Sequence, residues 1–160
     1  MTGDQVKRAY QLALRALCAT CLVVAAVSAA PAREDATPSI VAVDTLHWSP
    51  TPIHGVDGAT IVGSPGKDGL YVVYARYAAG VRSPPHTHPD TRIVTVVSGT
   101  FYAGAGTEFD GSKTEALKPG MTIVVPARAP HFGWAKDGQV ILQEVGVGPT
   151  GIDLVGRNRH

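Results

Sequence analysis

The sequence predicts an all-β domain, and two observations carry this prediction. Short runs rich in Val, Ile, Tyr and Thr recur along the chain, separated by Gly, Pro and Asp-Gly turn signals. Beyond residue 32, no stretch sustains a helical period of useful length. Brief strands at this spacing are typical of a β-sandwich or a β-barrel. The expected strands are Ile40–Val43, Ala59–Val62, Leu70–Tyr77, Ile93–Val97, Phe101–Ala103, Thr122–Val125 and Val140–Val145.

Residues 1–32 have the pattern of a helical signal peptide. Basic residues up to Arg15 precede the apolar run Ala16–Val27, and small residues at Ser28–Ala32 offer a cleavage site. The apolar run is short for a membrane span. We therefore expect a protein that is secreted or periplasmic and has no membrane attachment after cleavage. An uncleaved membrane tether is the alternative.

The remaining chain fits a linker with a first strand at residues 33–43 and one domain at residues 44–160. Three of the 14 basic and one of the 13 acidic residues precede Arg33, so the mature chain is close to neutral and lacks a nucleic-acid-binding stripe. Both cysteines lie in the leader, which excludes a thiol nucleophile and disulfides after cleavage. The one helical turn expected in the domain falls at Glu115–Leu117.

The stretch from Gly80 to Gly99 contains the central chemical motif, His86 and His88. Successive side chains of a strand point to opposite faces, so this H-x-H spacing places both imidazoles on one face, close enough to share an ion. Pro84 and Pro85 bar a helix and place the histidines on a strand or its entry loop. A second stretch, from Gly120, contains the same components, a glycine, an apolar strand and two prolines, and ends at His131.

These two stretches resemble the paired motifs of the cupin superfamily. The first motif reads G-x5-H-x-H-x3 or 4-E-x6-G, and the second reads G-x5-P-x-G-x2-H-x3-N. Arg92 stands at the glutamate position, while Arg128 and Ala135 replace the second glycine and the asparagine. The resemblance implies a double-stranded β-helix, the cupin jelly-roll barrel. The positions that agree are Gly80, His86, His88, Gly99, Gly120, Pro126 and His131.

The resemblance also implies a divalent transition metal (Fe, Zn, Ni, Mn or Cu) held by His86, His88 and His131, without a carboxylate ligand. An inward Arg92 about 5 Å from the metal would be repelled by roughly 6 to 7 kcal/mol at an effective dielectric near 20. Arg92 must therefore swing away, pair with Asp90 or Glu144, or share an anionic ligand with the metal; otherwise no metal binds. Glu144 is the preferred partner. Asp90 is either a displaced ligand or an ordinary turn residue.

For function, the resemblance to three-histidine iron cupins implies a dioxygenase-like enzyme as the leading hypothesis. Its substrate would be small and anionic, with Arg92 and Glu144 as catalytic residues and Arg92 clamping the substrate. Isomerase or lyase chemistry, a non-catalytic small-ligand or metal-binding module, and a degenerate metal-free cupin are the alternatives. Strands that are apolar on both faces are consistent with a homodimer. The aromatic side chains expected to line the pocket, or else to fill the core, are Tyr102, Phe132 and Trp134.

Overall fold

A computed structural model describes residues 37–155 of the chain. Within this range the regular secondary structure is almost entirely β-strand, with two short 3-10 turns, η1 (Val43–Thr45) and η2 (Gly111–Lys113). The strands are β1 (Ser49–Pro50), β2 (Val56–Val62), β3 (Gly69–Tyr77), β4 (Arg82–Thr87), β5 (Arg92–Ser98), β6 (Phe101–Ala105), β7 (Glu115–Leu117), β8 (Thr122–Val125), β9 (His131–Trp134), β10 (Val140–Gly148) and β11 (Asp153–Leu154).

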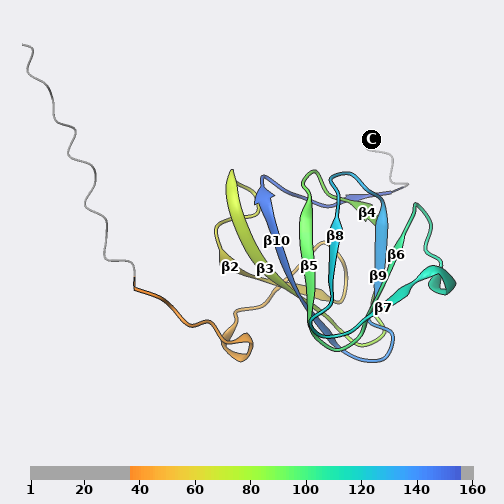
Figure 1. The fold of residues 1–160 in the computed structure, drawn as a ribbon, viewed down its shortest axis with the longest axis horizontal. Coiled ribbons are helices and arrows are strands. Elements are labelled where there is room, and N and C mark those ends of the chain that lie inside the picture. The colour runs from red at the N-terminus through yellow and green to blue at the C-terminus, as the bar shows by residue number, and fades with distance from the viewer. Residues whose placement is uncertain (1–36, 156–160) are drawn as a thin grey trace, which may run out of the picture. The chain divides into compact units, whose positions relative to one another are not determined.

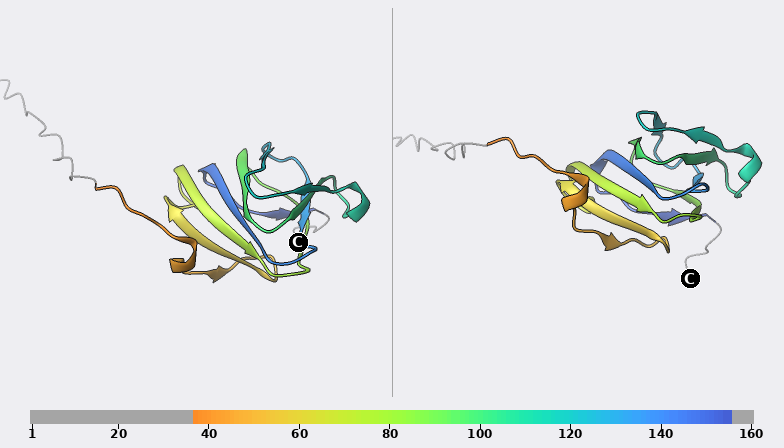
Figure 2. Two further views of the ribbon diagram at one scale, coloured as in Figure 1. Left: turned by 60° about the horizontal axis from the view of Figure 1, so that its bottom comes forward. Right: turned by 90° about the horizontal axis from the view of Figure 1, so that it is seen from below.

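The strands form two antiparallel sheets (Figures 1 and 2). The larger sheet has the order β1-β2-β3-β10-β5-β8, and the smaller has the order β11-β4-β9-β6-β7. β10 lies between β3 and β5 and pairs with both, although it is far from each in sequence. This crossing of distant strands gives the jelly roll that the family resemblance implied.

Alternation along the strands sets which side chains face the interior. On β5, Val94 and Val96 are buried while Ile93 and Val97 are exposed. Leu142 of β10 lies opposite Val96 and is buried with it. Apolar side chains from both sheets therefore meet between them, and burial of this apolar surface is the main force that holds the sheets together.

Two of the expected elements are wrong. Ile40–Val43 forms no strand: Ile40 is 99% exposed, and β-propensity without a partner strand does not hold a strand in place. Glu115–Leu117 is strand β7, because it pairs with β6 through Phe101 and Leu117. The helical turn falls just before it, at η2, where the side chain of Asp110 accepts a hydrogen bond from the Ser112 backbone N–H.

The expected signal peptide lies outside the described residues. Among residues 37–155, no helix has the length and apolar character needed to cross a membrane.

Candidate metal centre and its cavity

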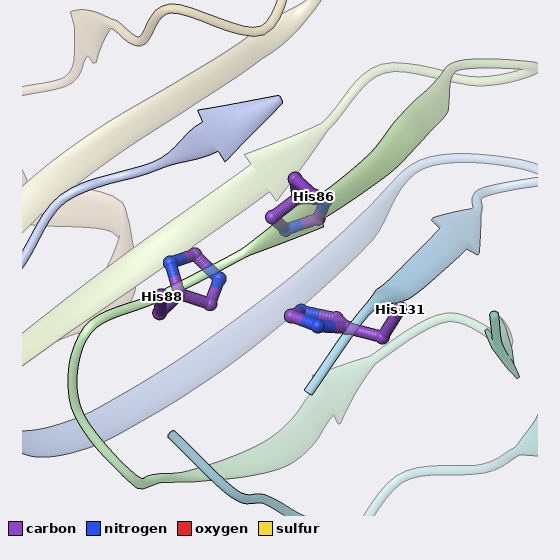
Figure 3. A group of neighbouring side chains, drawn as sticks. All are labelled: His86, His88 and His131. Atoms are coloured by element: carbon purple, nitrogen blue, oxygen red, sulfur yellow. The ribbon is translucent and has the colours of Figure 1, made fainter. Parts of the chain in front are cut away.

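Three histidines from two distant parts of the chain meet between the sheets (Figure 3). His86 lies on β4, His88 just after it, and His131 at the start of β9. The ring centroids of His86 and His131 are 4.3 Å apart, and those of His86 and His88 are 4.8 Å apart. One ligand nitrogen from each residue lies within 4.8 Å of the others. The convergence expected from the two motifs is therefore present.

Each imidazole is held by its Nδ1 atom. The Nδ1 atoms of His86, His88 and His131 lie 2.7, 2.7 and 2.9 Å from the carbonyl oxygens of Pro84, Gly151 and Ala129. A carbonyl only accepts hydrogen bonds, so each Nδ1 carries the proton and each Nε2 has a free lone pair. This is the tautomer that metal-binding histidines adopt when a carbonyl orients them. The donor set thus fits a divalent metal with three imidazole ligands.

Burial keeps the three imidazoles neutral. Desolvation, followed by the charge of nearby His131, lowers the pKa of His86 to about 4. Desolvation and then the charge of Arg92 lower the pKa of His88 to about 3, and desolvation also lowers that of His131. Since a metal binds only the unprotonated nitrogen, all three groups are in the ligating form at neutral pH.

A bulge in β4 aligns two of these histidines. Ser83 pairs with Gly133 and His86 pairs with His131, so three steps along β4 match two steps along β9. The extra residue falls at the proline pair, which lacks the N–H groups that a regular ladder needs. This extra residue reverses the alternation of side-chain direction along β4. Ser83 and His86 therefore both face the interior, although they are three residues apart.

Arg92 is buried beside the histidines and paired with both acids named in the sequence analysis. It is 6% exposed, and its Nη1 and Nη2 groups donate to Glu144 Oε2 at 2.8 Å and Asp90 Oδ1 at 3.0 Å. Nη2 also donates to Thr150 Oγ1 at 2.6 Å. Two carboxylates thus surround one guanidinium, which offsets the repulsion expected between an unpaired arginine and a metal. An arginine engaged in this way is poorly placed to clamp a substrate anion.

Asp90 is the more saturated of the two acids. One oxygen accepts from Arg92 and Thr150, and the other accepts from Tyr71 Oη at 2.5 Å. Burial raises the pKa of Asp90, but the hydrogen bonds from Thr150, Tyr71 and Arg92 outweigh it and hold the pKa below its usual range. Burial and the hydrogen bond to Asp90 raise the pKa of Tyr71 to about 12, so Tyr71 remains a neutral donor.

The histidines form one part of the wall of a cavity of about 420 Å³ between the sheets. Their polar neighbours in the wall include Arg92, Glu144 and Thr150. Apolar side chains dominate the rest of the wall, so the cavity fits a compact apolar molecule with a polar end. Those apolar residues include Ile53, Val56, Val73, Tyr77, Val94, Phe101, Val125 and Leu142.

The expected aromatic pocket is wrong for Tyr102 and Trp134, which are absent from the cavity wall. His131 faces inward on β9, so Trp134, three residues later, faces outward with Phe132. Phe132 contributes to the cavity wall, but its ring packs over Gly104, and its centroid lies 5.0 Å from that of the Phe109 ring. The position of His131 already fixes this alternation, so the sequence contained the signal.

Sequence reasoning also missed three polar residues of the site. Tyr71 and Thr150 complete the hydrogen bonds of Asp90, and Ser83 Oγ accepts from the Gly133 N–H at 2.8 Å. Tyr71 could have been identified as a polar group on the inward face of the apolar strand β3, whereas Ser83 lies on β4, which the sequence did not reveal as a strand. No local signal marks Thr150, because the chain reaches the site there only after β10 has ended.

Comparisons with known proteins agree with this geometry. A family model described as a cupin domain matches residues 73–142. Germin-like protein subfamily 1 member 17 of Arabidopsis thaliana is 37% identical over 68 residues, which cover 40% of this chain and 31% of the relative. The match therefore spans about a third of the length of this curated relative.

Two solved structures show the same architecture. The polyketide cyclase RemF from Streptomyces resistomycificus superposes with a TM-score of 0.64 at 16% identity, covering 77% of this chain and 89% of that one. Salicylate 1,2-dioxygenase from Pseudoaminobacter salicylatoxidans, in its adduct with gentisate, gives 0.55 at 19% identity over 67% and 31%. At these identities the similarity establishes the fold alone.

Proposed function

From the cupin-domain match over residues 73–142 we propose that the chain is a member of the cupin superfamily and a metal-dependent enzyme acting on a small molecule bound inside the barrel. The observation that carries the proposal is the histidine triad: the buried imidazoles of His86 and His88 converge with the half-buried one of His131, and each has Nδ1 on a carbonyl and Nε2 free. Three ligands leave coordination positions open, which is the arrangement of catalytic sites rather than structural ones.

The reaction that we propose is dioxygenase-like, with iron as the metal. Bound iron would supply an electrophilic, redox-active centre with positions open to substrate and dioxygen. The protein would supply the three imidazoles and a largely apolar cavity that excludes water from the reacting molecule. The similarity of fold to a dioxygenase whose structure contains gentisate supports this choice.

The substrate that we propose is small and largely apolar, with oxygen donors at one end that are negatively charged when bound. The apolar wall would bury its body, while the oxygen donors would reach the histidine end of the cavity. Among the wall residues, Arg92 is neutralised by Asp90 and Glu144. Charge recognition of the substrate would therefore fall to the metal rather than to Arg92.

Metal content tests the proposal directly. We expect protein purified without a histidine tag and reconstituted with Fe²⁺ to hold about one metal per chain by elemental analysis. His131→Ala should lose it, because two imidazoles rarely hold a divalent ion alone. His54 is exposed and outside the triad, so His54→Ala is the matched control. A wild-type content far below one per chain would overturn the proposal.

Oxygen consumption tests the reaction class. We expect the iron-loaded protein to consume oxygen with a member of a panel of diketones, catechols and thiols, and the His131→Ala variant to be inactive. Full metal occupancy with no turnover on any of these compounds would instead favour a binding protein.

We further propose that the protein is exported and forms a homodimer. Export rests on the signal-peptide pattern of residues 1–32. The mass of the mature chain tests it, because that mass reveals the residue at which the N-terminus lies after cleavage.

The homodimer rests on the outer face of the larger sheet, where Ile93, Val124 and Val147 are 46%, 62% and 62% exposed. Exposed apolar groups that gather on one sheet face favour association with a second copy.

A further inference from the structure

Glu144 is the carboxylate of the cavity wall that has unused hydrogen-bonding capacity. Its Oε2 accepts from Arg92 Nη1 at 2.8 Å, and the described residues provide no partner for Oε1. The side chain is 16% exposed, against 6% for that of Asp90. One oxygen is therefore fixed, and the carboxylate keeps an acceptor for a ligand in the cavity that it lines.

Its position on β10 aims Glu144 inward. Glu144 lies opposite Val94 of β5 and Val73 of β3, and both of these also line the cavity. The charged and titratable groups that act on it are Arg92 from β5, Tyr77 from β3 and His131 from β9. Glu144 and the three histidines line the same cavity, so the carboxylate faces the space into which the triad opens.

Glu144 nevertheless lies outside the ligand set. In the described part of the chain, the group of residues that could hold a metal ion consists of the three histidines and does not include Glu144. The salt bridge to Arg92 also holds Oε2 away from that role. A carboxylate beside a metal centre, but not bound to it, is suited to exchange protons with a molecule that is bound there.

We propose that Glu144 accepts a proton from a phenolic or enolic hydroxyl of the substrate, and that Arg92 is the positioning residue that holds it for this step. The inference rests on the proposed function and adds to it the substrate class and the proton acceptor. The O–H bond of the substrate breaks, its electron pair stays on oxygen, and the proton passes to Glu144 Oε1. Arg92 keeps its hydrogen bond to Oε2 throughout, and the step needs no oxidant.

Asp90 does not take this role, because its two oxygens already accept hydrogen bonds from Arg92, Thr150 and Tyr71. A proton on Asp90 would displace one of these donors. Glu144 can take a proton on its free oxygen without losing any contact that the structure contains.

Proton release on ligand binding tests the proposal without turnover. The probe is 4-nitrocatechol, added at pH 7 to zinc-loaded protein, with binding followed by calorimetry in buffers of different ionisation enthalpy. If Glu144 takes the proton, the wild type should release about one proton fewer to the buffer than Glu144→Gln. Glu144→Asp retains a carboxylate and should behave as the wild type does. Glu115 is exposed on β7, so Glu115→Gln is the control for loss of a carboxylate.

The other outcomes separate this proposal from the proposed function. Equal proton release by the wild type and Glu144→Gln would overturn the role of Glu144, as would loss of zinc in Glu144→Gln, since that would make it a ligand. Failure of 4-nitrocatechol to bind zinc-loaded wild type would overturn the substrate class. Absence of zinc from the wild type would overturn the proposed function itself.

Discussion

Arg92 is a buried cation whose charge depends on two neighbouring acids. Its guanidinium lies between Asp90 and Glu144, and its side chain is 7% exposed. Removing one member of a buried ion cluster leaves the rest without compensation, and such losses reach roughly 3 to 5 kcal/mol. Position 92 is therefore a structural centre of the site, whatever the reaction.

We expect Arg92→Met to lower the free energy of unfolding by about 3 to 5 kcal/mol, because two carboxylates would remain buried without their cation. Urea denaturation measures the loss. Arg76→Met is the matched control, since Arg76 pairs with Asp57 at the same 2.8 Å but both side chains are about a third exposed. That change should cost about 1 kcal/mol or less from its ion pair. Equal losses in the two variants would contradict the account of Arg92.

The lowered histidine pKa values predict that metal-free protein loses stability in mild acid. The pKa of His88 falls from 6.5 to about 3 on folding, so between these values the unfolded chain binds a proton that the folded chain does not. Stability therefore decreases as the pH falls below 6.5, by about 1.4 kcal/mol per pH unit for each such histidine. His86 adds the same slope down to about pH 4.

Urea midpoints of metal-free protein at pH 7, 6 and 5 measure this slope. His88→Asn should reduce the slope of stability against pH by the contribution of one proton, about 1.4 kcal/mol per pH unit. His54→Asn, at an exposed position, should leave the slope unchanged. An unchanged slope in His88→Asn would show that this imidazole is not the group being protonated on unfolding.

Strand β4 shows why some elements were predictable and others were not. Val-rich runs such as Leu70–Tyr77 and Thr122–Val125 were predicted as strands and are confirmed as β3 and β8. β4 contains Pro84 and Pro85, which weaken any strand prediction, and only its pairing with β9 and β11 reveals it. Local propensity cannot supply a partner that lies far away in the sequence.

The same limit applies to the site. The spacing of the two motifs was enough to group His86, His88 and His131, because strand alternation and the motif resemblance can both be identified within short stretches of sequence. The pairing of Arg92 with Glu144 was predicted from charge and is present. Thr150 was not predicted, because its position depends on the path of the chain after β10. Local patterns therefore identify the ligands, whereas the tertiary fold determines the hydrogen bonds that hold them.

Arg128 lies in the turn before β9 with a φ of 62°, the left-handed region in which side chains are strained. It stands where the cupin motif has glycine, and its backbone N–H donates to the carbonyl oxygen of His88 at 2.7 Å. This turn therefore connects the two histidine segments directly, at some cost in backbone strain.

We expect Arg128→Gly to raise the free energy of unfolding by up to about 1 kcal/mol, because relief of the left-handed strain exceeds the entropy that glycine adds to the unfolded chain. The side chain of Arg128 is exposed, so little contact is lost. Arg128→Ala keeps the strain and removes the side chain, and it should give no such gain. Chemical denaturation of the three proteins checks both statements, and a gain in Arg128→Ala equal to that in Arg128→Gly would assign the effect to the side chain.

The two sheets of the barrel differ in what their outer faces present. On the smaller sheet, Trp134 is covered by cations: the Arg82 guanidinium lies 4.2 Å and the Lys136 amino group 5.4 Å from its ring centroid. On the larger sheet, Ile93, Val124 and Val147 project from β5, β8 and β10 and are exposed. The larger sheet is therefore the face with unburied apolar surface, and it is where we place the contact with a second copy.

A charge within the exposed apolar group on that face should abolish the proposed dimer. Val124 is 62% exposed and pairs with Ile93 across β5 and β8, so Val124→Glu would bury a carboxylate in the contact without disturbing the core. We expect the wild type to have twice the chain mass by light scattering and the variant to have the mass of one chain. Thr107→Glu, at an exposed position after β6, is the matched control and should remain dimeric. A wild-type mass of one chain would rule out the homodimer. A dimeric Val124→Glu would show that the contact lies on another face, because a buried carboxylate without a partner costs too much for an interface to persist at Val124.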